Sequence, residues 1–111
     1  MEELFLQKIG LTNGEIKVYF ALLHIGTSSA GPITNESKVA RSKLYDILNR
    51  LSSKGLVSHS IKNGIKQFSV AQPSRLLDFL RKREEEVKLL QKEANKILPQ
   101  LEKEYELQKV K

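Results

Sequence analysis

The chain has 111 residues with 19 Lys or Arg and 13 Asp or Glu, so its formal net charge is +6 and its pI lies near 9.6. It contains no cysteine, which excludes disulfide scaffolds, thiolate zinc sites and cysteine nucleophiles. The longest apolar run, Val18 to Leu23, is too short for a membrane span, and the acidic start Met1-Glu2-Glu3 lacks the basic segment of a signal peptide, so we expect a cytoplasmic protein with no membrane partner.

The first 26 residues predict a short apolar helix or arm and then a central helix. The arm is indicated by four apolar residues, Leu4, Phe5, Ile9 and Leu11. Thr12 followed three residues later by Glu15 is a capping box, so the second helix is expected to begin after Thr12 and to end near Ile25, before Gly26. Its apolar residues surround most of the cylinder, which predicts a core helix or part of a subunit interface.

Two further helices are predicted between Pro32 and Gly55. Pro32 suits the first turn of a short helix that ends at Ser37. After a turn, a helix is expected over residues 40–54, with Gly55 in the position that follows a helix end. Its expected buried side carries four apolar residues at helical spacing, Leu44, Ile47, Leu48 and Leu51.

A β-hairpin is predicted next, because Asn63-Gly64 between two strand-like segments is the strongest short signal for a two-residue turn. In the first strand, three larger residues alternate with three polar ones, namely Val57, His59 and Ile61 with Ser58, Ser60 and Lys62. This alternation predicts a ribbon with one covered face.

From Ser74 onward the pattern predicts one long helix, which Pro99 is expected to kink or divide. Apolar residues recur along it at the spacing of a heptad seam, interrupted at Arg83: Leu76, Leu80, Val87, Leu90, Ala94, Ile97 and Leu101. A helix of this length extends beyond a small domain, and a second copy of the chain is the simplest cover for the seam. We therefore expect residues 1–72 to form one domain and residues 73–111 a coiled-coil-like dimerisation segment.

The order of these elements predicts a fold that is mostly α with a small β-hairpin, a winged helix-turn-helix domain followed by a long dimerisation helix. The positive charge is concentrated in one part of it. Between Lys38 and Lys66 the chain has seven cations and one anion, Asp46, and this balance of +6 equals the net charge of the whole chain. A local basic surface of this kind is typical of a phosphate-binding face, and a chance imbalance on a solvated surface is the alternative.

Several segments of the sequence resemble the TrmB-type archaeal transcriptional regulators. The likeness covers roughly residues 9–72 and continues into the helix that contains Leu98-Pro99. It is carried by Ile9-Gly10-Leu11-Thr12, Glu15, Lys17-Val18-Tyr19, Ala21-Leu22-Leu23, Gly26, Arg41-Ser42-Lys43-Leu44-Tyr45-Asp46-Ile47-Leu48, Leu51 and Lys54-Gly55-Leu56-Val57. The resemblance implies a winged-helix repressor or activator that dimerises and binds promoter DNA. Many such proteins also carry a large C-terminal sugar-sensing domain. This chain ends just after the long helix, so we expect a short form without sugar sensing.

The residues themselves also favour binding to double-stranded DNA. Helix 40–54 is expected in the major groove, with Arg41 reading guanine and Asn49 reading adenine, and the wing, residues 57–70, is expected on the backbone or minor groove. Asp46 is expected to orient a neighbouring cation instead of reading a base. The full set of predicted contacts is Thr34, Asn35, Lys38, Arg41, Ser42, Lys43, Tyr45, Asn49, Arg50, Lys62, Asn63 and Lys66.

No residue cluster predicts an enzyme, a cofactor or a metal site. His24 and His59 are interpreted as isolated, structural or exposed histidines, and no Gly-rich phosphate loop or nucleophile with its base is present. The leading hypothesis is a homodimeric, sequence-specific transcriptional regulator, most simply a repressor that occludes a promoter. The alternative is a winged-helix protein–protein adaptor within a larger assembly.

Overall fold

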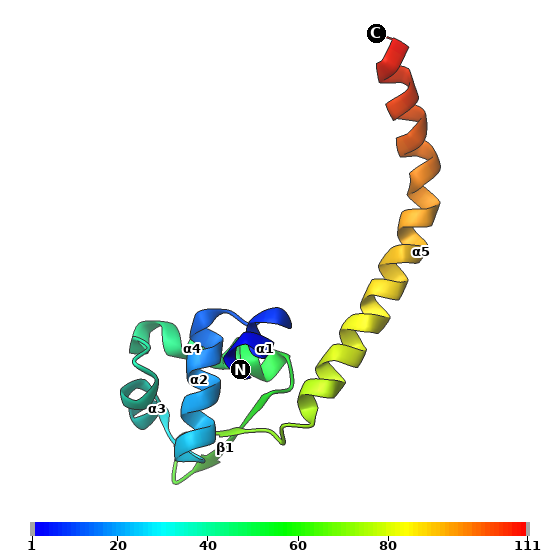
Figure 1. Ribbon diagram of the computed structural model, residues 1–111. Coiled ribbons are helices and arrows are strands. Elements are labelled where there is room, and N and C mark those ends of the chain that lie inside the picture. Colours follow the sequence, from blue (N-terminus) through cyan, green and yellow to red (C-terminus); the bar gives the residue numbers. More distant parts are fainter. Residues whose placement is uncertain (1, 111) are drawn as a thin grey trace. The chain divides into compact units, whose positions relative to one another are not determined.

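The computed structural model describes residues 2–110, and the expected order of elements is confirmed (Figure 1). The elements are α1 (Glu2–Lys8), α2 (Asn13–Ile25), α3 (Ala30–Ser37), α4 (Arg41–Ser53), β1 (Val57–Lys62), β2 (Ile65–Val70) and α5 (Arg75–Val110). The chain divides into two compact units after Phe79. No helix in the described part of the chain combines the length and apolarity needed to cross a lipid bilayer.

Helix α2 is the core helix of the first unit, and its N-terminus has the predicted capping box. The Thr12 hydroxyl accepts a hydrogen bond from the Glu15 backbone N–H at 3.2 Å, and the Glu15 carboxylate accepts one from the Thr12 N–H at 2.8 Å. Helix α2 contacts α1, α3, α4 and β2, which covers most of its apolar surface, although Leu23 remains 44% exposed. The helix ends before Gly26, as predicted.

Helices α3 and α4 form the helix-turn-helix. Helix α3 begins two residues before Pro32, so the proline lies in the first turn. Backbone N–H groups in the first turn have no acceptor within the helix, so the N–H that proline lacks costs no helical hydrogen bond. The turn is made by Lys38 in a left-handed conformation with φ 63°. In α4 the four predicted apolar residues are all buried, and Gly55, with φ 76°, follows the helix as predicted.

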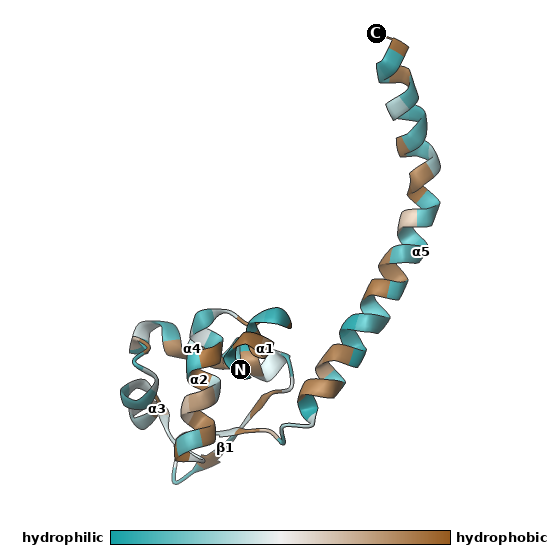
Figure 2. Ribbon diagram, in the orientation of Figure 1, coloured by the Kyte–Doolittle hydropathy of each residue, from teal (hydrophilic) through white to brown (hydrophobic). Residues whose placement is uncertain are grey.

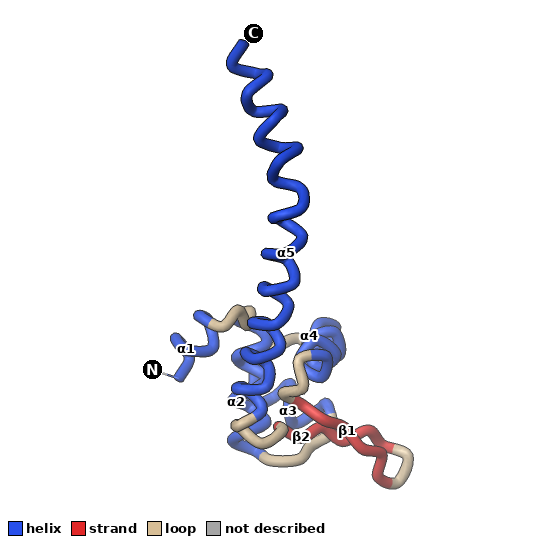
Figure 3. Tube along the Cα trace, turned by 90° about the vertical axis from the view of Figure 1, so that its right-hand side faces the viewer, coloured by secondary structure: helices blue, strands red, loops and turns tan. Residues whose placement is uncertain are grey.

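The two strands form the predicted antiparallel hairpin, shown in Figure 3 with its turn at the end that projects from the helices. Asn63 and Gly64 both have positive φ, 52° and 76°, as a type I′ turn requires. The base of the hairpin is joined to the segment between α2 and α3, because Ser28 and Phe68 exchange backbone hydrogen bonds of 2.9 and 2.7 Å. Phe68 is buried, so the hairpin is anchored at its base and free at its tip.

We expected one face of the first strand to be covered, and this expectation is wrong for most of the strand. Of the six residues of β1, Val57 is buried and the other five are exposed, including His59 and Ile61. The ribbon extends past the helices, so no second layer covers the outer residues of this face.

Helix α5 runs without a break from Arg75 to Val110, so the division expected at Pro99 does not occur. The proline removes one backbone donor, and the carbonyl that loses its partner lies in an exposed turn, where water can satisfy it. None of residues 75–110 is buried, although apolar residues recur along the helix (Figure 2).

The turn at the hairpin tip gives a direct test of the fold. Replacing Gly64 by Ala places a Cβ atom on a residue with φ 76° and should lower the free energy of unfolding by about 1 kcal/mol. Urea denaturation followed by circular dichroism measures the change. Asn63→Gly is the matched control, since it removes a side chain at the neighbouring positive-φ residue and should be close to neutral; equal losses in both variants would contradict the turn assignment.

Candidate nucleic-acid interface

The exposed face of α4 has short polar side chains and a cationic N-terminal end. Four of the predicted contacts lie together in its first two turns, and all are exposed: Arg41, Ser42, Lys43 and Tyr45. Ala40 precedes the helix and has no side chain that can cap its first backbone N–H groups. The positive end of the helix dipole is therefore open beside Arg41 and Lys43, an arrangement that suits a phosphate group.

Five cations of the basic segment have no carboxylate partner among residues 2–110. These are Lys38, Arg41, Lys43, Lys62 and Lys66, and all five are exposed. They come from the turn between α3 and α4, the start of α4 and the two sides of the hairpin tip. The backbone of Lys38 is in a left-handed conformation that Gly or Asn adopts more easily. A lysine at this position therefore carries a conformational cost.

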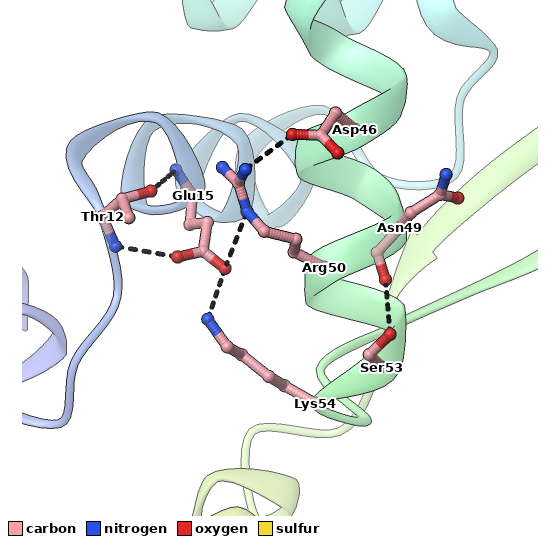
Figure 4. A network of polar contacts seen from close by, with 7 residues as sticks. All are labelled: Thr12, Glu15, Asp46, Asn49, Arg50, Ser53 and Lys54. Atoms are coloured by element: carbon pink, nitrogen blue, oxygen red, sulfur yellow. Dashed lines mark hydrogen bonds and ion pairs between the residues drawn. The ribbon is translucent and has the colours of Figure 1, made fainter.

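The other two cations of the segment, Arg50 and Lys54, are bound within the fold (Figure 4). Glu15 in α2 is 1% exposed, and its Oε2 atom lies 2.5 Å from the Lys54 Nζ and 3.9 Å from the Arg50 Nε. Arg50 also donates a 2.6 Å hydrogen bond to Asp46, which confirms that Asp46 orients a neighbouring cation. This network joins the N-terminal cap of α2 to the last turn of α4.

The pKa of Glu15 reflects this environment. Burial alone would raise the pKa of the carboxyl group, but the hydrogen bonds from the Lys54 ammonium and the Thr12 backbone, together with the Lys54 charge, hold the pKa below its ordinary value. Glu15 is therefore ionised at neutral pH, although almost no water reaches it. Sequence reasoning assigned Glu15 to the capping box and missed its second role, because its partner is 39 residues away in the chain.

The remaining predicted contacts differ in accessibility. Asn35, Asn49 and Asn63 are exposed, and Figure 4 shows Asn49 on a side of α4 away from Glu15. Tyr45 is 45% exposed as a residue, and its ring packs edge-on against the buried Phe68, so it links α4 to the hairpin. The Thr34 hydroxyl is buried and has no hydrogen-bond partner within residues 2–110, so it is the least accessible of the set.

His24 is exposed, as expected, but the interpretation of this residue as isolated is wrong. Its Nδ1 atom lies 2.9 Å from the Glu36 carboxylate of α3, in an exposed pair that the sequence did not indicate because the two residues lie on different helices. Nowhere in residues 2–110 do three His, Cys, Asp or Glu side chains gather as a metal site would require.

Comparison with known proteins identifies the family. Residues 6–74 match the family described as sugar-specific transcriptional regulator TrmB. The chain belongs to this family. Its members are transcriptional regulators and not enzymes, and the resemblance noted in the sequence is thereby confirmed.

Relatives of this TrmB-family chain are longer proteins. It is 44% identical over 52 residues to the HTH-type sugar sensing transcriptional regulator TrmBL1 of Pyrococcus furiosus, an alignment that covers 47% of the chain and 15% of TrmBL1. Its structure is similar to that of TrmBL2, an archaeal chromatin protein, with a TM-score of 0.79 and 24% identity over 89% of this chain and 40% of that one. A MarR family protein from Bacillus stearothermophilus has a TM-score of 0.55 and 16% identity over 96% of this chain and 80% of that one. These structural likenesses establish the winged-helix fold.

The buried carboxylate gives a pH-dependent prediction. Glu15→Gln should lower the free energy of unfolding by about 2 kcal/mol at pH 7, because Lys54 and Arg50 lose their charged partner. The folded-state pKa of Glu15 is lower than its ordinary value of 4.5, so the stabilisation is complete above that value and is lost as the pH falls through the folded-state pKa. The difference between the two proteins should therefore shrink below pH 4.5 in urea unfolding measured from pH 7 to pH 3.

Glu36→Gln is the matched control for this experiment. It removes the carboxylate of an exposed pair with His24 and should change stability by less than about 0.5 kcal/mol. A Glu15→Gln variant that is as stable as the wild type at pH 7 would show that the network does not hold α2 and α4 together.

Proposed function

We propose that the chain is a homodimeric, sequence-specific regulator that binds double-stranded promoter DNA and represses transcription by occlusion. In this proposal α4 with its flanking residues, 40–54, lies in the major groove, and the wing, residues 57–70, lies on the backbone or in the minor groove. The observation that carries the proposal is the set of five exposed cations at the turn before α4, the start of α4 and the wing tip, which have no carboxylate partner in the part of the chain that the structure describes. Membership of a family of transcriptional regulators supports the same assignment.

The side chains of α4 suit this role. Arg41 has the donor geometry for the O6 and N7 atoms of guanine, and Asn49 has the donor and acceptor that adenine requires. Lys38 and Lys43 lie near the uncapped start of α4, where they suit phosphate contacts that set the position of the helix. Arg50 belongs to the predicted contacts as well, but its guanidinium is bound to Asp46 and lies near Glu15, so we assign it chiefly to positioning α4.

The dimer is proposed from α5, with residues 73–111 as the dimerisation segment and residues 1–72 as the DNA-binding domain. A helix of 36 residues is roughly 54 Å long. Its heptad seam contains large apolar side chains with half or more of their surface exposed in the single chain: Val87, Leu90, Ile97 and Leu101. Pairing of two such seams buries these side chains and presents two copies of α4 to a pseudo-palindromic site.

The phosphate contacts are tested by a salt series. Fluorescence anisotropy with a 30-base-pair mixed-sequence duplex should show affinity that falls steeply with salt concentration. The double variant Lys38→Gln with Lys43→Gln should bind about a hundredfold more weakly at low salt and should lower the slope of log K against log[salt] by about 3.6, because two phosphate contacts are lost in each of two protomers. Lys92→Gln, an exposed cation of α5, is the control and should leave the slope unchanged. Absence of wild-type binding at low salt would overturn the proposal in favour of a protein–protein adaptor.

The dimer is tested by two leucines that are neighbours in sequence and almost equally exposed. Leu90 lies on the seam and is 60% exposed, whereas Leu89 lies off the seam and is 61% exposed. Light scattering should give twice the 12.7 kDa chain mass for the wild type and for Leu89→Lys, and a mass close to one chain for Leu90→Lys, because a charge on the seam must be buried on pairing. Equal behaviour of the two variants would contradict the proposed seam.

A further inference from the structure

The tip of the wing exposes two isoleucines that the hairpin fold does not use. Ile61 is 71% exposed and Ile65 is 55% exposed, and among the described residues 2–79 Ile61 has the largest exposed fraction of the large apolar side chains. By contrast Val57 and Phe68, at the base of the same hairpin, are buried against the helices. The apolar surface at the tip is therefore available to a partner.

The register of the strands pairs each isoleucine with a lysine. Ile61 is opposite Lys66, and Lys62 is opposite Ile65. Because residues directly opposite each other in an antiparallel pair share a face, each face of the tip presents one isoleucine and one lysine. The hairpin contains no Asp or Glu, so both faces combine apolar contact with positive charge and carry no negative charge.

We infer that Ile61 and Ile65 contact the sugar walls of the DNA minor groove, while Lys62 and Lys66 contact the phosphates on its two sides. This inference rests on the proposed DNA-binding function. The deoxyribose walls of the minor groove are apolar and its rims are anionic, so the groove matches the isoleucine and lysine on each face of the tip. Many proteins that bind this groove combine cationic side chains with apolar ones, including isoleucine, that enter the groove at base steps.

The dimensions of the groove give this contact a consequence for specificity. Neighbouring strands lie about 4.8 Å apart, and the minor groove of B-DNA is only about 6 Å wide, so the tip enters fully only where the groove opens. The energy needed to open it depends on the sequence, and the guanine 2-amino group stands on its floor. The wing thereby selects DNA by groove shape, at positions that α4 does not read.

The inference is tested with two versions of one 30-base-pair duplex, containing either guanine or inosine. Inosine lacks the minor-groove amino group and keeps the major-groove atoms of guanine. The wild type should bind the inosine duplex several-fold more tightly. The double variant Ile61→Thr with Ile65→Thr should bind the guanine duplex about tenfold more weakly and show no preference between the duplexes. Its salt slope should equal that of the wild type, because no charge is removed.

Two further variants keep the test independent of stability. Ile61→Val with Ile65→Val retains strand-favouring apolar residues and should lose a smaller part of the inosine preference. In a dimer, Lys62→Gln with Lys66→Gln should lower the slope of log K against log[salt] by about 3.6. This variant should still bind the inosine duplex more tightly than the guanine duplex. If both isoleucine variants bind as the wild type does, the inference is overturned while the proposed function stands. If the wild type binds neither duplex at low salt, the proposed function itself fails.

Discussion

The packing of α4 against α2 depends on one buried carboxylate. Glu15 closes the N-terminal cap of α2 through Thr12 and at the same time binds Lys54 at the end of α4. A buried charge is costly unless it is paired and hydrogen-bonded, so Lys54 and Arg50 must stay on the side of α4 that faces α2. This requirement limits the rotation of α4 about its axis. The close approach of Gly14 to Ile47, where an added Cβ would lie 2.8 Å from a methyl group, limits the distance between the same two helices.

The same interaction separates the cations of the basic segment into two sets, those paired within the fold and those left exposed. The segment from Lys38 to Lys66 has seven cations, but Arg50 and Lys54 serve the fold. The five that remain are exposed and lie before α4, at its start and on the wing. Net charge alone would have counted all seven as candidate phosphate contacts. Burial and pairing show which of them are available.

Local signals predicted the elements well because each of them acts within a few residues. The Thr12–Glu15 capping box, the Asn63-Gly64 turn and Gly55 after α4 are fixed by backbone geometry at short range, and all three are confirmed. The contacts that position the candidate site are different in kind. The Glu15–Lys54 pair, the His24–Glu36 pair and the Ser28–Phe68 bridge join residues that only the tertiary fold brings together. Periodicity predicted that one face of β1 would be covered. Such cover requires a second layer packed against the strand, and beyond Val57 the residues of β1 are exposed.

The two parts of the proposed DNA interface draw on different sources of free energy. In the proposed complex, cations at α4 and the wing act through released counterions, so their contribution is large, weakens with salt and is nearly independent of sequence. Apolar contact by Ile61 and Ile65 is insensitive to salt and depends on how readily the groove accepts the wing tip. In the same proposed complex, hydrogen bonds from α4 discriminate bases, and the charges set the position of the helix. A regulator built in this way keeps its discrimination as rising salt weakens the electrostatic contribution, because the terms that select sequence are those that salt affects least.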